Sequence, residues 1–550
     1  MDRVTRNAPE ALLGIAMVAS VALIVSLTRE MTFIQDTWEF LMNRREVTTD
    51  SLLVPHNEHI VVIPVMIEQL LLRVFGMTSA TPEYVLLAVA LAVAALLLFL
   101  YARRRVGAWL ALFAAVLLLF LGPAWEVLLW PFEIGFVGSV LFGIAMLLAL
   151  DRDDRDGDVA ACAFLAVSFG FSSVALPFAA AAAVDLLQKR RSRGLRRAYV
   201  VALPVALYAL WYLGWGSDAE THVTLDNVLS SPRFALESAA VAAGGVFGLG
   251  SGGLEGGADP AWGAALLVAL VAVFAYRQVR KPGFAPGFWP IAAAAAANWL
   301  LTAFNQMPGR DPSSSRYQYM GGVLVLLLLA NLLQGVRIGR RALIVAGAVT
   351  VAAVAVNLVV LKDGRDVLKA QSELTKANLA AIEIARRTVD PEFSLNPEIA
   401  GTATLVDVQA AKYLPAVEEY GSPAHSPAEL AAAPDYARRQ ADVVLSWALP
   451  LSVFTRLGAY ATRGGDENCV RLQRGDSPEL ALSAGLTRIE LAPGPRADFS
   501  LRRFATGEYP VSTEGAPGDS VTLLRVPRDN APRRPWYLRI ESSQPARVCR

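Results

Sequence analysis

Long apolar runs alternate with short polar segments along the first two thirds of the chain. A helix of about 20 apolar residues crosses a bilayer, and a shorter one crosses where the bilayer thins around it. The pattern therefore predicts a bundle of membrane-spanning helices. The runs lie at about 10–28, 83–101, 107–121, 132–150, 198–215, 261–276, 287–304, 317–334 and 341–361.

One further apolar stretch, Val159–Leu187, is too long for a single span, and Gly170-Phe171-Ser172-Ser173 stands in its middle. These residues predict the turn of a hairpin of two short membrane helices, which brings the count to about eleven spans. Polar residues interrupt the segment Ile60–Phe75, which favours an interfacial helix. The Ala- and Gly-rich segment Phe234–Leu249 is placed on the outer side, re-entrant or on the surface.

The basic residues orient this bundle. Lys and Arg gather in cytoplasmic loops of membrane proteins. The basic clusters all fall on one side of the predicted spans, which puts the N-terminus in the cytoplasm and everything after Leu361 outside the cell. These clusters are Arg3 and Arg6, Arg103–Arg105, Lys189–Arg197, Arg277–Lys281 and Arg337–Arg341.

The pattern changes after Lys362. Amphipathic helical segments reach to about residue 450, and from Leu451 onward apolar residues recur with period two between Gly, Pro and Asp turns, which is typical of a β-sandwich. The predicted fold is a multi-span α-helical membrane protein with a C-terminal exported α+β domain that ends in a β-sandwich. Its predicted parts are 1–361 (membrane domain), 362–450 (exported helical linker) and 451–550 (sandwich).

Composition agrees with the membrane class: the 550 residues are 54% hydrophobic and 18% charged, with a net charge of +1. Soluble domains carry about 25% charged residues. No basic run with interleaved aromatic residues suggests nucleic acid, and no cleavable signal peptide is expected. Cys162 is predicted to be a buried small hydrophobe. Cys469 and Cys549 would match a disulfide in an exported domain.

The first outer loop, from about Thr28 to Ile60, carries the first candidate chemistry. Asp36 can act as general base on an acceptor hydroxyl, with Glu39 as a second acid, and Trp38 can stack on a sugar ring. The alternative is a solvated loop acid.

The same loop closes on His56-Asn57-Glu58-His59. These side chains could bind a donor phosphate, orient a sugar, or hold a divalent metal together with Asp36. The spacing matches no standard zinc motif. Alternatively, Asn57 simply caps the helix that follows.

A later outer loop places Arg316, Tyr317 and Tyr319 at the start of a predicted span. Arginine binds a lipid-linked phosphate by a bidentate contact, although basic and aromatic residues also serve as interface anchors. Trp130 and Glu133 face the same side and join the candidate substrate-binding residues. The D-x-D matches within Asp151–Asp158 are interpreted as a solvated cytoplasmic turn.

This arrangement resembles the integral-membrane GT-C superfamily of glycosyltransferases, in particular cell-wall arabinofuranosyl- and mannosyltransferases. The resemblance implies a polyprenyl-phosphate sugar donor, a glycan or lipid acceptor, catalysis on the outer face of the cell membrane, and Asp36 as the catalytic acid residue. It also implies Arg316 as a donor-phosphate contact and the sandwich as a candidate carbohydrate-binding module. A divalent metal stays open as a cofactor.

Two other functions compete with this prediction. One is a non-catalytic transporter or polymerase-like protein for lipid-linked glycans, which would need charged residues lining a path through the spans, and these are scarce. The other is a binding or scaffold protein, which needs far fewer spans. The sequence identifies neither the donor sugar nor the acceptor.

Overall fold

The computed structural model describes residues 7–219, 221–250, 260–280, 282–396, 408–457, 469–477, 479–531 and 533–549. The chain forms two compact units. The first, called here the helical unit, comprises Met1–Glu30, Arg44–Leu71 and Thr81–Lys369. The second, the C-terminal unit, comprises Met31–Asn43, Leu72–Ala80 and Ala370–Arg550.

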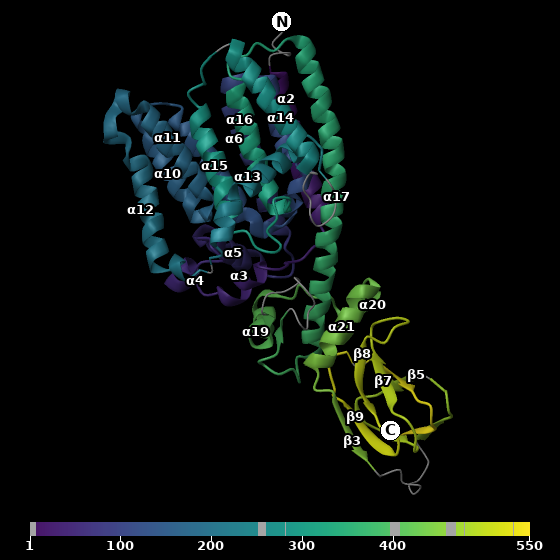
Figure 1. Cartoon of the computed structure of the whole chain (residues 1–550). Coiled ribbons are helices and arrows are strands. Elements are labelled where there is room, and N and C mark those ends of the chain that lie inside the picture. The colour runs from purple at the N-terminus through teal and green to yellow at the C-terminus, as the bar shows by residue number, and fades with distance from the viewer. Residues whose placement is uncertain are drawn as a thin grey trace. The chain divides into compact units, whose positions relative to one another are not determined.

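The helical unit is a bundle of apolar helices (Figure 1). Each predicted apolar run coincides with one of its helices. They are α2 (Ala8–Thr28), α4 (Thr49–Leu53), α5 (Val62–Phe75), α6 (Thr81–Val106), α7 (Ala108–Leu119), η1 (Gly122–Ala124), α8 (Trp125–Leu129), η2 (Pro131–Glu133), α9 (Ile134–Leu150), α10 (Arg155–Phe171), η3 (Ser173–Ala175), α11 (Leu176–Arg193), η4 (Gly194–Arg197), α12 (Tyr199–Gly214), η5 (Gly216–Asp218), α13 (Leu225–Val246), α14 (Pro260–Arg280), α15 (Phe288–Phe304), α16 (Ser315–Leu332) and α17 (Arg340–Ala385), the last of which continues into the C-terminal unit.

Several of these helices are long and apolar enough to cross a membrane, so the chain is a membrane protein. Among the described residues five pass this test, namely Ala8–Thr28, Thr81–Val106, Pro131–Leu150, Ala261–Val279 and Arg340–Ala385. A sixth span results if α7 and Gly122–Leu129, bent by 43°, count as one. The predicted count of about eleven is not reached by this test, partly because α12 and α15, with 16 and 17 residues, fall short of the ~20 that an upright span needs.

The predicted hairpin within Val159–Leu187 is confirmed. α10 ends at Phe171, and Ser172 is extended with its hydroxyl accepting a hydrogen bond from the Val174 backbone N–H, so the chain turns into η3 and α11. The hairpin packs on α9. A Cβ at Gly138 of α9 would lie 2.3 Å from the Phe171 ring, so only glycine permits this close approach.

The basic clusters of the helical unit meet at one end, called here the basic end. Arg103 at the end of α6 pairs with Glu10 at the start of α2 at 3.0 Å. Arg105 pairs with Asp151, just after α9, at 2.9 Å and donates to Asn331 near the end of α16 at 3.1 Å. These contacts bring the ends of three predicted spans together, as the alternating direction of the spans requires.

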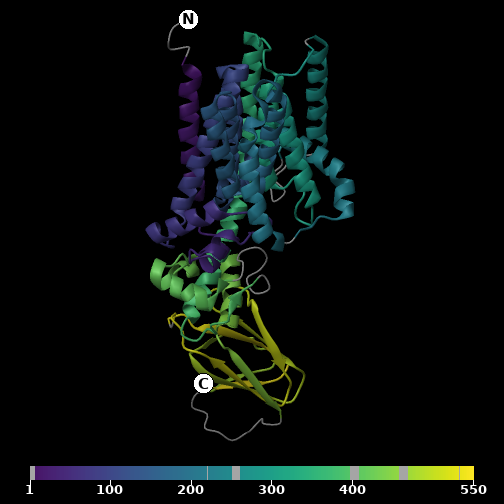
Figure 2. The same ribbon diagram turned by 90° about the vertical axis from the view of Figure 1, so that its left-hand side faces the viewer.

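The C-terminal unit ends in two antiparallel sheets, which confirms the predicted sandwich. The four-stranded sheet has the order β5-β10-β7-β8, and the five-stranded sheet has the order β3-β9-β6-β11-β4. Figure 2 shows these strands following the helices of the unit. Alternate residues such as Leu538 and Ile540 point into the core, which explains the period-two pattern of the sequence. The elements of this unit are α3 (Thr37–Asn43), β1 (Ser394–Leu395), β2 (Val408–Gln409), α19 (Ala410–Tyr420), α20 (Pro427–Ala432), α21 (Asp435–Ala448), β3 (Ser452–Leu457), β4 (Cys469–Leu472), β5 (Glu479–Leu482), β6 (Gly485–Leu491), β7 (Ala497–Arg502), β8 (Val511–Ala516), β9 (Ser520–Val526), β10 (Trp536–Glu541) and β11 (Ala546–Cys549).

A buried carboxylate joins α21 to the sandwich. Asp442, fully buried, accepts hydrogen bonds from the backbone N–H groups of Arg503, Phe504 and Ala505 at 2.8 to 3.1 Å. Arg503 in turn pairs with Asp529. Because every one of these polar groups has a partner, the junction is stable without a continuous apolar interface.

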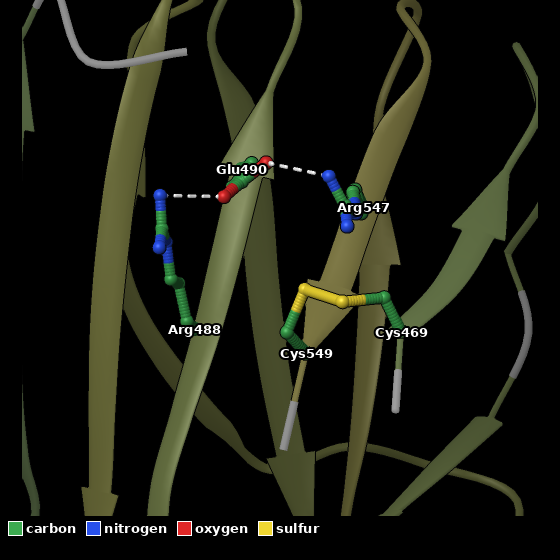
Figure 3. The surroundings of a disulfide bond; sticks show 5 residues. All are labelled: Cys469, Arg488, Glu490, Arg547 and Cys549. Carbon is green, nitrogen blue, oxygen red and sulfur yellow. Dashed lines mark ion pairs between the residues drawn. A yellow bond between two sulfur atoms is a disulfide. The ribbon is translucent and has the colours of Figure 1, made fainter. Parts of the chain in front are cut away.

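The predicted disulfide between Cys469 and Cys549 is confirmed. The two residues face each other across neighbouring strands β4 and β11, with Cα atoms 4.1 Å apart. Figure 3 shows the bond beside Glu490, which lies between Arg488 at 2.7 Å and Arg547 at 3.9 Å. The bond fastens edge strand β4 to the sheet.

Removing this bond should destabilise the C-terminal unit. The two cysteines are 80 residues apart, and closing a loop of this length stabilises by about 4–5 kcal/mol in the chain-entropy model. We expect Cys549→Ser to lower the free energy of unfolding of the C-terminal unit by about this amount, measured by denaturant unfolding of the full chain. Cys162→Ala, at the free cysteine, is the control. Equal unfolding midpoints for Cys549→Ser and wild type would contradict the expectation.

Candidate functional site

The candidate site is built around a tight turn at the end of the helical unit opposite the basic end. His56 and His59 exchange two backbone hydrogen bonds, each 3.0 Å long. Asn57, at the corner, has a left-handed backbone with φ +50, which asparagine tolerates better than most residues. Asn57 is therefore the turn residue. It does not cap α5, which begins five residues later at Val62.

Two side chains hold this turn in place. Arg44, almost fully buried, donates to the carbonyl oxygens of Val54 and Pro55 at 2.8 and 2.9 Å. On the other side, the Ser173 hydroxyl in the hairpin turn donates to the Glu58 carbonyl at 3.2 Å, and it accepts a bond from Tyr208 at 3.2 Å. The turn is thus fixed both to its own loop and to the helices around it.

The turn presents Glu58 to an arginine from the loop before α16. Arg310 contacts both carboxylate oxygens of Glu58, at 2.6 and 3.2 Å. Burial raises the pKa of the Glu58 carboxyl, but the charge of His59 and the hydrogen bond and charge of Arg310 together hold that pKa below its ordinary value. His59 carries a charge only in acid, so at neutral pH Arg310 keeps Glu58 ionised.

The two histidines of the turn lie edge-on against phenylalanines. The His56 ring is 5.0 Å from Phe132, and the His59 ring is 5.3 Å from Phe136. Burial, together with the nearby His56 and Arg310 charges, lowers the pKa of His59 to about 4 despite the opposing effect of Glu58. His59 is therefore neutral at physiological pH.

This packing bears on the predicted divalent metal at Asp36, His56 and His59. Within the described ranges, no group of three or more His, Cys, Asp or Glu side chains could hold a metal ion. The imidazole rings are directed at aromatic neighbours and do not converge on a common point with carboxylates. The structure therefore gives no support to a metal centre built from these residues.

Arg316 stands in the first turn of α16 and contacts Glu126 of α8. The Arg316 backbone N–H donates to Glu126 at 2.9 Å, and its guanidinium lies 3.7 Å from the same carboxylate. The Arg316 side chain is 40% exposed. The longer contact and the exposure leave its guanidinium accessible to an anionic ligand.

Side chains from both arginine contacts line one cavity of about 340 Å³. The lining is polar on one side, with two arginines, two asparagines and three tyrosines, and apolar on the other. The lining residues are Glu58, His59, Phe136, Ser173, Val174, Leu176, Pro177, Tyr208, Tyr212, Thr221, Asn298, Leu301, Thr302, Asn305, Arg310, Arg316, Tyr317 and Met320.

Of the predicted site residues, the structure brings Glu58, His59, Arg316 and Tyr317 together in this cavity. His56 and Asn57 shape the turn and are not among its lining residues.

Three other predicted substrate-binding residues are packing residues of the helical unit. Trp130, Glu133 and Tyr319 are only 3%, 5% and 1% exposed, and none of them lines this cavity. Trp130 stacks on Phe132, with ring centroids 5.2 Å apart. The sequence pattern could not separate them from lining residues because aromatic side chains at helix ends serve both purposes.

The segment with Asp36 belongs to the C-terminal unit. Gln35, directly before Asp36, has φ +49, and its side chain donates to Gln371 at 2.8 Å. A left-handed backbone at a residue other than glycine is costly and is found more often at functional sites. Glu39, in the first turn of α3, accepts a hydrogen bond from Asn43.

Trp38 corrects one prediction. Its ring is 0% exposed, its indole N–H donates to the Phe33 carbonyl at 3.1 Å, and it packs edge-on against Tyr413. A ring with no exposed face cannot stack on a sugar, so Trp38 is a core residue of the C-terminal unit.

Sequence reasoning missed several residues of the cavity. Arg310 stands only six positions before Arg316 and could have been proposed on the same grounds. Ser173, Tyr208, Asn298 and Asn305 come from separate helices and carry no motif. Only the fold brings them together.

No protein-family model matches the chain, and none of the curated proteins compared with it matches. Among solved structures, the chain is similar to the crystal structure of ArnT from Cupriavidus metallidurans bound to undecaprenyl phosphate. The match has a TM-score of 0.43 and 14% sequence identity, and it covers 69% of this chain and 81% of that chain. A likeness of this degree assigns no role to any residue of this chain.

The lowered pKa of His59 predicts how stability depends on pH. The unfolded chain binds a proton at His59 below about pH 6.5, whereas the folded chain does so only below about pH 4, so stability falls as pH drops through this window. We expect His59→Gln to remove on the order of 2–3 kcal/mol of this pH-dependent loss. The measurement is thermal unfolding of wild type and variant between pH 7 and pH 4, with His222→Gln as the control. Parallel curves for wild type and His59→Gln would refute the prediction.

Proposed function

We propose that the protein is an integral-membrane glycosyltransferase that moves a sugar from a polyprenyl-phosphate donor to a glycan or lipid acceptor of the cell envelope. The observation that carries this proposal is the single cavity in a membrane-type helical unit that combines two arginines with amide, hydroxyl and tyrosine side chains. This lining is complementary to a ligand with a phosphate, a sugar and an apolar chain.

The phosphate is assigned to the arginines. Guanidinium groups bind phosphate oxygens by paired, charge-assisted hydrogen bonds. Arg316 is the first choice because its 3.7 Å contact with Glu126 leaves its donors within reach of a ligand. Arg310, held at 2.6 Å by Glu58, adds positive charge at a fixed position. Both charges favour departure of the phosphate as the bond to the sugar breaks.

The sugar is assigned to the polar wall. Asn298 and Asn305 each offer an amide that both donates and accepts hydrogen bonds, as sugar hydroxyls require. Tyr208 and Tyr212 add hydroxyls and aromatic faces. The apolar residues Leu176, Leu301 and Met320 on the other wall suit the first isoprene units of the donor lipid.

The proposed general base is Asp36, with Glu39 as the second acid of the same loop. Asp36 takes the proton of the acceptor hydroxyl as the hydroxyl oxygen attacks the anomeric carbon. The bond from that carbon to the phosphate oxygen breaks, and polyprenyl phosphate leaves with the electron pair. Attack on the face opposite the leaving group inverts the anomeric configuration. Glu58 is less suited to this role because Arg310 stabilises its ionised form and so weakens it as a proton acceptor.

The proposed topology places the basic end in the cytoplasm and the C-terminal unit outside the cell. The basic clusters gather at one end of the helical unit, as cytoplasmic ends do. The Cys469–Cys549 bond supports an oxidising compartment for the sandwich. Transfer would then take place on the outer face of the membrane.

Replacing the proposed base should stop turnover but keep donor binding. Asp36→Asn preserves size and hydrogen bonding but lacks a proton acceptor, so we expect single-turnover transfer to fall about 10²–10⁴-fold. The assay uses purified full-length protein with a panel of polyprenyl-phosphate sugars and measures donor affinity in parallel. Asp50→Asn, in the neighbouring helix α4, is the control. Near-normal transfer by Asp36→Asn would move the role of the base to Glu39 or Glu58.

Replacing the proposed phosphate ligand should have the complementary effect. Arg316→Ala removes a charged hydrogen-bond donor, which typically contributes about 1.5–3 kcal/mol. We expect donor affinity to fall about 10–100-fold. Arg233→Ala, an exposed arginine paired with Glu237, should leave affinity unchanged. Unchanged donor affinity in Arg316→Ala would exclude the assigned phosphate contact.

A further inference from the structure

A second cavity lies at the basic end of the helical unit and is almost wholly apolar. Its volume is about 710 Å³, roughly twice that of the candidate site. Side chains of α6, α7, α14, α16 and α17 line it, among them Leu117, Phe274, Leu329 and Val349. One charged residue stands in this lining, Arg277 near the end of α14.

The Arg277 guanidinium is only partly satisfied by the protein. One of its terminal nitrogens donates to the Gly283 carbonyl at 3.0 Å. Its Nε is buried and has no hydrogen-bond partner among the described residues. Burying a donor without a partner costs free energy. A ligand oxygen at the cavity mouth would remove this cost.

The surroundings of the mouth are also positively charged. Gly335 and Val336 line the cavity and immediately precede Arg337, and α17 begins with Arg340 and Arg341. Within the described part of the chain, no carboxylate pairs with Arg277, Arg337, Arg340 or Arg341.

Other arginines at the basic end do have counter-charges. Arg103 pairs with Glu10, and Arg105 pairs with Asp151. The shortage of counter-charge is therefore local to the mouth of this cavity.

We propose that this cavity binds a diacyl phospholipid with an anionic headgroup. The acyl chains occupy the apolar cavity, and the phosphate accepts hydrogen bonds from Arg277, with the other arginines adding positive potential. Basic pockets between membrane helices recognise anionic headgroups in this way. The breadth of the cavity, lined by five helices, suits two chains better than the single chain of a polyprenyl phosphate.

This site is distinct from the candidate catalytic cavity. Helix α15 separates them: Phe288 at its start stacks with Phe274 of the second cavity, whereas Asn305 just beyond its end lines the first. A helix of 17 residues is about 25 Å long. The inference therefore does not depend on the proposed glycosyltransferase activity.

The test measures lipid binding to the full-length protein in detergent. Phosphatidylglycerol, phosphatidylcholine and undecaprenyl phosphate are titrated separately, and bound lipid is counted by native mass spectrometry. We expect phosphatidylglycerol to bind at least tenfold more tightly than phosphatidylcholine, and Arg277→Gln to remove most of this preference. Arg103→Gln, at the same end but paired with Glu10, should keep it.

A second variant separates the cavity from its charge. Ala346→Trp fills the apolar lining and should reduce phosphatidylglycerol binding while Arg277 is still present. Unfolding temperatures in lipid-free detergent identify any variant that is misfolded, and Ala346→Leu, with a smaller side chain, replaces it in that case. Equal binding of the two phospholipids, or an unchanged preference in Arg277→Gln, would overturn the proposal. Tighter Arg277-dependent binding of undecaprenyl phosphate than of phosphatidylglycerol would overturn the choice of a diacyl lipid.

Discussion

Irregular backbone inside an apolar helical unit must find its hydrogen-bond partners within the protein, and the candidate site depends on how this chain meets that requirement. The segment Arg44–Ile60 is largely non-helical. Arg44 supplies donors to its carbonyl groups, and Ser173 bonds to the turn from the neighbouring hairpin. A turn fixed at both sides presents Glu58 and His59 in one orientation. Loss of either anchor would release the residues that line the cavity.

The arginines of the helical unit differ in how completely their charge is compensated. At one end Arg310 is held by Glu58 at two short distances, and Arg316 makes a longer contact with Glu126. At the basic end Arg105 is fully engaged with Asp151 and Asn331, whereas Arg277 has only a backbone carbonyl. An arginine with a short bidentate partner serves the architecture, and one with an incomplete partner set is available for an anion.

The helical unit could be predicted from the sequence because apolar length and turn residues act locally. The hairpin turn at Gly170–Ser173 and the disulfide partners are examples. The number of spans could not, since α12 and α15 are shorter than an upright span and hydropathy alone does not say how such helices lie.

The candidate site was predictable only where polar residues cluster in sequence. The turn His56–His59 and the arginine loop before α16 stood out for that reason. Trp38 failed as a sugar platform because residue type does not reveal burial, and in the structure the ring is enclosed by Phe33 and Tyr413. Asn298 and Asn305 escaped notice because one asparagine in an apolar helix, or just after it, carries no pattern.

The state of Glu58 constrains the chemistry that the cavity can support. A carboxylate that receives two hydrogen bonds from one guanidinium has little remaining affinity for a proton. It therefore sets the position and charge of Arg310 more effectively than it could accept a proton from an acceptor hydroxyl. A phosphate that enters the cavity meets one arginine already neutralised by Glu58 and another, Arg316, with a weaker partner. The ligand phosphate then supplies the negative charge that Arg316 lacks, and Arg310 stays paired throughout. On this argument the cavity binds the donor by completing an existing charge network, and proton removal falls to a carboxylate outside that network.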